Sequence, residues 1–169
     1  MSQWSGHRTL EVVTLGLDGE VFAIDAGIVR EILDIVPVTR VPGANPLVGG
    51  LINVRGKVVP LADPRVRLGM QIRPPTIDSR ILVIEAELKS GPGIVGLLAD
   101  KVYEVTEVAA SALEETPRLG MRWPPHLIRC IGKRNDDFVI VLEIGRLFST
   151  NEPPVSVNAG ESKNDSASA

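Results

Sequence analysis

The stretch LVGGLINVRGKVVPLADPRVRL, residues 47–68, decides the fold of this chain. Two runs rich in Val, Ile and Leu flank Arg55-Gly56, and a glycine at a reversal between such runs is typical of a β-hairpin. The second run ends at Asp63-Pro64, an order of residues that favours the start of a short helix. We therefore predict a β-hairpin with an arginine at its tip, followed by a helical turn.

The same pattern returns near the end of the chain as LIRCIGKRNDDFVIVLEIGRLF, residues 127–148. Leu47 aligns with Leu127 and Leu68 with Phe148 without a gap, each pair 80 residues apart (127 − 47 and 148 − 68). A looser match places VFAIDAGIVREI over VGLLADKVYEV. We predict two copies of one unit, with a chance match between β-branched runs as the alternative.

Composition indicates a chain built mainly from β-strands. The chain has 169 residues, of which 44% are hydrophobic and only 4% aromatic. Turn residues separate its apolar runs into four candidate hairpins. Each unit then holds about five strands, which suits two small barrels that share an apolar interface. Short helical turns are expected at residues 28–33, 64–68 and 144–148, and after Ser111.

The ends of the chain differ from its body. Residues 1–8 are expected to be flexible, and residues 151–169 are rich in Ser, Asn, Ala and Pro and are predicted to be disordered. The body, residues 9–150, is divided into lobe one at about 9–78 and lobe two at about 79–150. One cysteine and no signal peptide or apolar run of membrane-spanning length lead us to expect a cytoplasmic protein.

The sequence motifs favour a protein that is not an enzyme and has no cofactor or metal. The motif Gly91-Pro-Gly-Ile-Val-Gly96 matches a dinucleotide fingerprint, but a β-branched run follows it where the fingerprint needs a helix. His7, His126 and Cys130 lack the spacing of metal ligands. A net charge of −3 provides no basic face for nucleic acid. A small-barrel enzyme and a nucleic-acid module remain the alternatives.

Glu31 and Arg55 are the most informative charged residues. They have opposite charges, and Val29, Ile32 and Val54 surround them in the sequence. They can be ordinary solvated charges, or they can form a polar pair on an apolar docking surface, where arginine is often important for binding.

The chain resembles the CheW-like domain family of bacterial chemotaxis. The motifs that carry the resemblance are V-P-G-x-x-P and G-x-I-N-x-R-G, then V-P-L-x-D, together with VFAIDAGIVREIL, IVGLLADKVYEV and FVIVLEIGRLF. The resemblance implies two five-stranded SH3-like barrels and a free adaptor that has no catalysis of its own. Its partners would be the cytoplasmic tips of chemoreceptors and the regulatory domain of the histidine kinase CheA. It would be recruited to receptor arrays at the membrane.

The resemblance also assigns residues to the two partners. Three departures put only details of lobe packing in doubt: Ala62 where a larger β-branched residue is usual, Pro64 where leucine is common, and Gly145 in the last short helix. An adaptor of a chemosensory array that controls pili, a second messenger or development is the alternative function. The receptor-binding residues would be Val29, Glu31, Ile32, Gly50, Arg55, Val102 and Val105, and the kinase-binding residues Val38, Val41 and Leu47.

Overall fold

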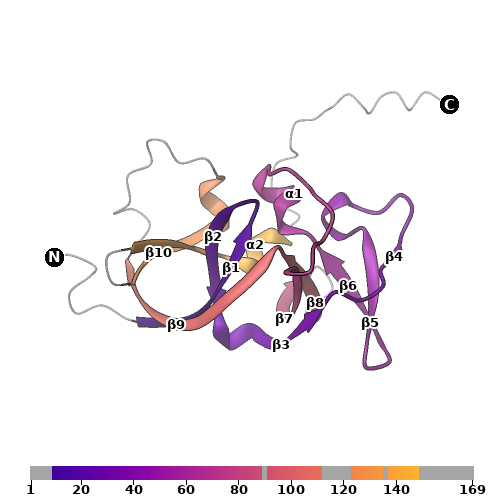
Figure 1. Cartoon of the computed structure of the whole chain (residues 1–169), viewed down its shortest axis with the longest axis horizontal. Coiled ribbons are helices and arrows are strands. Elements are labelled where there is room, and N and C mark those ends of the chain that lie inside the picture. Colours follow the sequence, from indigo (N-terminus) through magenta and orange to yellow (C-terminus); the bar gives the residue numbers. More distant parts are fainter. Residues whose placement is uncertain (1–8, 89–90, 112–122, 135–136, 149–169) are drawn as a thin grey trace.

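The structure is a computed structural model that describes residues 9–88, 91–111, 123–134 and 137–148 (Figure 1). It consists of eleven strands, two short α-helices and three single turns of 3-10 helix within those residues. The strands are β1 (Thr9–Leu17), β2 (Glu20–Asp25), β3 (Val29–Asp34), β4 (Thr39–Arg40), β5 (Gly50–Val54), β6 (Lys57–Ala62), β7 (Arg80–Leu88), β8 (Gly91–Ala99), β9 (Lys101–Ser111), β10 (Ile128–Arg134) and β11 (Asp137–Leu142). The helical segments are η1 (Ala26–Ile28), η2 (Pro46–Val48), α1 (Pro64–Leu68), η4 (Pro125–Leu127) and α2 (Ile144–Leu147).

The strands form two sheets that lie side by side (Figure 1). One is a closed five-stranded barrel with the order β1-β2-β11-β10-β9. The other is a six-stranded sheet with the order β3-β7-β8-β6-β5-β4. We call them the closed barrel and the open barrel. The prediction of a mainly β chain with two small barrel-like sheets is confirmed.

The internal repeat is real and extends to single hydrogen bonds. The amide N of Asp63 donates to the carbonyl O of Leu47 at 2.9 Å, and the amide of Glu143 donates to Leu127 at 2.8 Å. Both partners of the second bond lie 80 residues beyond those of the first (143 − 63 and 127 − 47). The strands follow the same rule, because β6 spans residues 57–62 and β11 spans 137–142.

The division into lobes at 78/79 does not match how the strands pair. The β1–β2 hairpin closes its barrel with β9, β10 and β11 from the second copy, through parallel pairs such as Ile140 with Phe22. The β7–β8 hairpin of the second copy completes the open barrel of the first, where Leu61 pairs with Gly96. The first hairpin of each copy therefore pairs with the strands of the other copy. We call this the exchange of hairpins. Sequence similarity cannot reveal this exchange, because two equivalent hairpins offer nearly the same edges.

The open barrel has six strands where five were expected, because one strand is broken. In the closed barrel, the single strand β9 pairs with both β1 and β10. In the open barrel, β3 pairs with β7 and β4 pairs with β5. Pro37 lies in the gap between β3 and β4, and a proline has no N–H to donate to a strand ladder. Together β3 and β4 occupy the position of β9.

The predicted helix at residues 28–33 is wrong, whereas the helices after Asp63 and at residue 144 are confirmed. Only η1 precedes Val29, and Asp25 caps it by accepting a 2.8 Å hydrogen bond from the amide of Gly27. The chain from Val29 onward is strand β3. Its β-branched residues suit a strand, and pairing with β7 outweighs the apolar spacing that suggested a helix.

Three apolar cores follow from the alternation of side chains along the strands. One core fills the closed barrel, with Val12, Val108 and Val141 among its members, and one fills the open barrel around Ile52 and Ile81. The largest core lies between the two barrels and takes side chains from both. Its residues on the two exchanged hairpins are Val13, Leu15, Leu17, Phe22, Ile24, Leu82, Ile84, Ala86, Val95, Leu97 and Ala99.

The expectations for residues 1–8 and 151–169 and for the turn after Ser111 fall outside the described residues. Among the helices that the structure describes, none has the length and apolar character needed to cross a membrane.

Candidate docking surface

An ion pair joins β3, an edge strand of the open barrel, to the tip of the β5–β6 hairpin. Glu31 lies on β3 and Arg55 lies in the turn between β5 and β6. Nη2 of Arg55 lies 2.6 Å from Oε1 of Glu31, and Nε donates to Oε2 at 3.3 Å. The two contacts form a fork between the guanidinium and the carboxylate. The fork connects β3 with the β5–β6 turn, although β3 is not a neighbour of β5 or β6 in the sheet.

The turn that carries Arg55 is held in an uncommon conformation. Arg55 has φ of 53° and Gly56 has φ of 85°, which is typical of the tight turns that connect hairpin strands. The side-chain oxygen of Asn53 accepts a 2.8 Å hydrogen bond from the amide of Gly56. The motif N-x-R-G thus fixes the turn through its asparagine and glycine, and leaves the arginine side chain projecting from the tip.

The pair is accessible to a partner, though its two members differ. The Arg55 side chain is 77% exposed and that of Glu31 is 26% exposed. The hydrogen bond from Arg55 lowers the pKa of Glu31, and the same bond raises the pKa of Arg55. Both groups are therefore charged at neutral pH. The pair with Glu31 does not use Nη1 of Arg55, which can donate to a second acceptor.

The other predicted receptor-binding residues come from both barrels. Ile32 is exposed on β3, and Val29 is partly buried against the core between the barrels. On β9 of the closed barrel, Val102 is likewise partly buried against that core, while Val105 is 57% exposed. The predicted receptor surface is thus composite, with one part on β3 and the β5–β6 turn and another on β9.

Gly50 and Leu47 are buried, which the sequence did not indicate. A Cβ atom on Gly50 would lie 2.5 Å from Cγ1 of Val38, so the glycine provides the space that Val38 occupies. Leu47 is only 5% exposed and belongs to the core between the barrels. Gly50 has no side chain, and the buried side chain of Leu47 is covered by the core. Val38 and Val41, which flank β4, are 39% and 38% exposed and remain as candidate kinase contacts.

The closed barrel carries a counterpart of the ion pair that sequence comparison missed. Arg134 at the end of β10 forms an ion pair with Glu104 on β9. These residues correspond to Arg55 and Glu31 after a shift of one position in the repeat, so direct alignment did not pair them. Within the residues that the structure describes, no group of three or more His, Cys, Asp or Glu side chains could hold a metal ion.

Comparison with known proteins agrees with this architecture. The family model described as "CheW-like domain" matches residues 11–152. The chain is 30% identical over 142 residues to the chemotaxis protein CheW of Rhizobium meliloti, covering 84% of this chain and 89% of that protein. It is 28% identical over 115 residues to protein PilI of Pseudomonas aeruginosa, covering 68% of this chain and 59% of that protein.

A solved structure has the same fold. The scaffolding protein TtCheW from Thermoanaerobacter tengcongensis superimposes with a TM-score of 0.71 at 27% sequence identity, covering 85% of this chain and 95% of that one. The family match covers most of the chain and includes both barrels. The chain therefore belongs to the CheW-like domain family, and it is a chemotaxis scaffold of the CheW type.

Proposed function

We propose that this protein couples chemoreceptors to the histidine kinase CheA and catalyses no reaction itself. The observation that carries the proposal is the exposed Glu31–Arg55 pair, whose strand β3 also carries the exposed Ile32. Arginine in apolar surroundings is frequently a dominant contact in protein interfaces. The receptor tip would bind across β3, the β5–β6 turn and β9, at Val29, Glu31, Ile32, Arg55, Val102 and Val105.

The kinase would bind a different part of the molecule. Val38 and Val41 flank β4 at the edge of the open barrel, where a regulatory domain can dock while the receptor occupies the composite surface. Because the two partners would use separate elements, one scaffold can hold both at once. The protein would then act in the cytoplasm at membrane-associated receptor arrays and transmit a shift between receptor states to the kinase.

Replacing Arg55 by alanine tests the receptor-binding surface. We expect Arg55→Ala to weaken capture of receptor cytoplasmic tips by about tenfold or more, the range of an interface hot spot. Circular dichroism should show an unchanged fold, because Arg55 is exposed. Capture of the kinase regulatory domain should not change. Undiminished receptor binding would contradict the site assignment.

Two further variants test whether Arg55 contacts the receptor directly or acts only through its ion pair with Glu31. Arg129→Ala is the control, because Arg129 on β10 also forms an ion pair, with Asp25, outside the surface proposed for the receptor, so its loss should leave receptor capture unchanged. The exchanged variant Glu31→Arg with Arg55→Glu restores an ion pair but moves the guanidinium. If Arg55 contacts the receptor, the exchanged variant should bind as weakly as Arg55→Ala.

A second candidate is an adaptor of a chemosensory array whose output is not flagellar. The similarity to protein PilI supports it. Both candidates predict the same surface and differ only in the receptor and kinase that are bound. Purification of the protein from its native cells, followed by identification of the kinase that accompanies it, distinguishes the two.

A further inference from the structure

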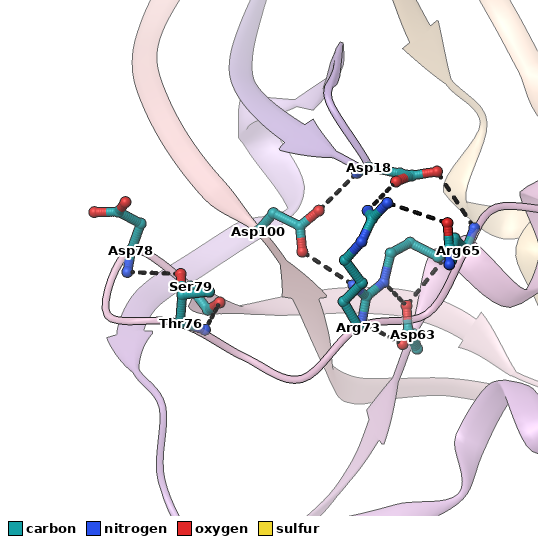
Figure 2. A network of polar contacts seen from close by, with 9 residues as sticks. Asp18, Asp63, Arg65, Arg73, Thr76, Asp78, Ser79 and Asp100 are labelled. Carbon is teal, nitrogen blue, oxygen red and sulfur yellow. Dashed lines mark hydrogen bonds and ion pairs between the residues drawn. The ribbon is translucent and has the colours of Figure 1, made fainter.

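A buried arginine on α1 connects the two barrels. The Arg65 residue is 2% exposed, one of three buried polar or charged residues among those described. Its guanidinium binds both oxygens of Asp63, through Nε at 2.9 Å and Nη2 at 2.8 Å, and its Nη1 binds Oδ1 of Asp100 at 3.1 Å. Figure 2 shows the Arg65 side chain between these two carboxylates.

The connection continues from Asp100 into the closed barrel. Asp100 lies between β8 of the open barrel and β9 of the closed barrel. Its second carboxylate oxygen accepts a 2.6 Å hydrogen bond from the amide of Asp18, in the β1–β2 turn, and its own amide donates to Gly16 at 2.9 Å. A continuous path of hydrogen bonds thus runs from α1 through Asp100 to β1.

Three further contacts join the α1 region to the closed barrel and α2. Arg73, in the segment between α1 and β7, forms an ion pair with the carboxylate of Asp18 (Figure 2). The amide of Gln71 donates to the other oxygen of Asp18. Arg67, also on α1, donates to the carbonyl of Leu147 in α2. We call Asp18, Asp63, Arg65, Arg73 and Asp100 the interbarrel clasp.

The core of the contact between the barrels is apolar. Hydrophobic burial is not directional, so two apolar faces can pack at slightly different angles for a small difference in free energy. Arg65 is buried, whereas the Asp100 side chain is 37% exposed, so the Arg65–Asp100 pair adds little net stability. Removing Asp100 would leave a buried charge without one of its partners, which is costly, so the pair favours one arrangement of the barrels over its neighbours. The clasp is the directional part of the interface.

The position of the clasp relates it to the composite surface. Asp100 comes two residues before Val102 and directly precedes β9, which carries the closed-barrel part of that surface. Arg65 lies on α1. That helix follows β6, the second strand of the hairpin whose turn carries Arg55. The two halves of the composite surface are therefore connected through the Arg65–Asp100 contact.

From this placement we infer that Arg65 and Asp100 are positioning residues that align the β9 half of the receptor-binding surface with the Arg55 half. The inference rests on the proposed function, because it assumes that a receptor binds across both barrels. Neither residue needs to touch the receptor, since both act through the orientation of β9.

A distance between the barrels tests the clasp without any partner. Spin labels on cysteines at Val58 in β6 and Glu107 in β9, both exposed, report the arrangement once Cys130 is replaced by alanine. We expect Asp100→Asn and Arg65→Met to broaden the distance distribution measured by pulsed electron resonance. Asp100→Asn keeps the Arg65–Asp63 pair, so it is informative even if Arg65→Met does not fold.

Receptor binding by the same variants tests the positioning role. If the competent orientation falls to about a tenth of the population, the apparent affinity falls about tenfold. Arg129→Met is the matched control, because it removes a half-exposed ion pair with Asp25 inside the closed barrel alone. It should change neither the distance distribution nor binding. Arg65→Lys keeps the positive charge but not the paired hydrogen bonds to Asp63. It should partly restore the narrow distance distribution and receptor binding.

The outcomes separate the two proposals. An unchanged distance distribution in folded Asp100→Asn and Arg65→Met would overturn the clasp. A broadened distribution with undiminished receptor binding would overturn the positioning role. If the wild-type protein binds no receptor tip at all, the proposed function fails, and the distance measurement alone decides whether the clasp orients the barrels.

Discussion

Glu31 and Arg55 lie 24 residues apart in the chain. They meet because β3 and the β5–β6 hairpin belong to the same open barrel. Arg55 lowers the pKa of Glu31 below its usual value of 4.5, mainly through their hydrogen bond. The carboxylate that faces the docking surface is thus ionised across the physiological range. Its charge is a constant feature of the surface and does not act as a pH switch.

The pKa of Glu31 leads to a prediction on acid stability. Because its folded pKa is lowered, the pair contributes stability above the unfolded pKa and loses it as the pH falls through the folded pKa. The difference in unfolding free energy between wild type and Glu31→Gln should therefore be constant at neutral pH and shrink as the pH falls below the ordinary pKa of 4.5 and through the lowered folded pKa. Urea titrations at a series of pH values measure it. A difference that persists undiminished at the acid end would contradict this assignment.

The charged pair could be predicted from the sequence, whereas the clasp could not. Glu31 and Arg55 occur in motifs whose neighbours are apolar, which marks them as unusual. Asp63 and Asp100 look like ordinary residues that cap turns, and Asp63 does cap α1 by accepting a bond from the amide of Arg65. Their second role needs the two barrels to be placed together, and no local pattern encodes that placement.

The break between β3 and β4 is the main difference between the two barrels at the level of elements. Where β9 runs without interruption, β3 ends at Asp34 and the chain resumes as the two-residue strand β4. The valines on either side of β4, Val38 and Val41, are exposed. The sequence predicted the hairpins well, since their signals are local. The helix predicted at residues 28–33 was wrong because pairing with the distant strand β7 determines the conformation of β3.

Gly50 shows how β4 is seated against β5. An alanine at this position would bring its Cβ within 2.5 Å of Cγ1 of Val38, so Gly50→Ala should destabilise the protein by about 1–3 kcal/mol. In a Val38→Ala background the same substitution should cost less, because the clashing atom is gone. A double-mutant cycle in urea measures the coupling, which we expect to be about 1 kcal/mol. Strictly additive effects would show that the two residues are independent.

The exchange of hairpins determines how the whole molecule folds. The core between the barrels takes one face of β1–β2 and one face of β7–β8, and the opposite faces fill the closed and open barrels. Neither half of the sequence contains a complete barrel. The repeat could be predicted because its two copies keep the same spacing, but the partner of each hairpin could not, because both copies present equivalent edges.

Cutting the chain between residues 78 and 79 tests this arrangement. We expect fragments 1–78 and 79–169 to lack a cooperative thermal transition when separate, because each leaves apolar faces without a partner. Mixing them should restore the circular dichroism spectrum of the intact protein. Leu15→Asp in the first fragment should prevent recovery, since Leu15 is fully buried between the barrels. A sharp transition in either fragment alone would contradict the exchange.

The exchanged hairpins give this chain the geometry of a domain-swapped dimer whose two protomers have been joined by a peptide linker. In a true swapped dimer, each barrel forms only when two molecules meet, so its stability falls on dilution. Here the residues between α1 and β7 keep both protomer equivalents at a fixed effective concentration. Both barrels therefore form at any dilution, and a scaffold present in few copies remains folded.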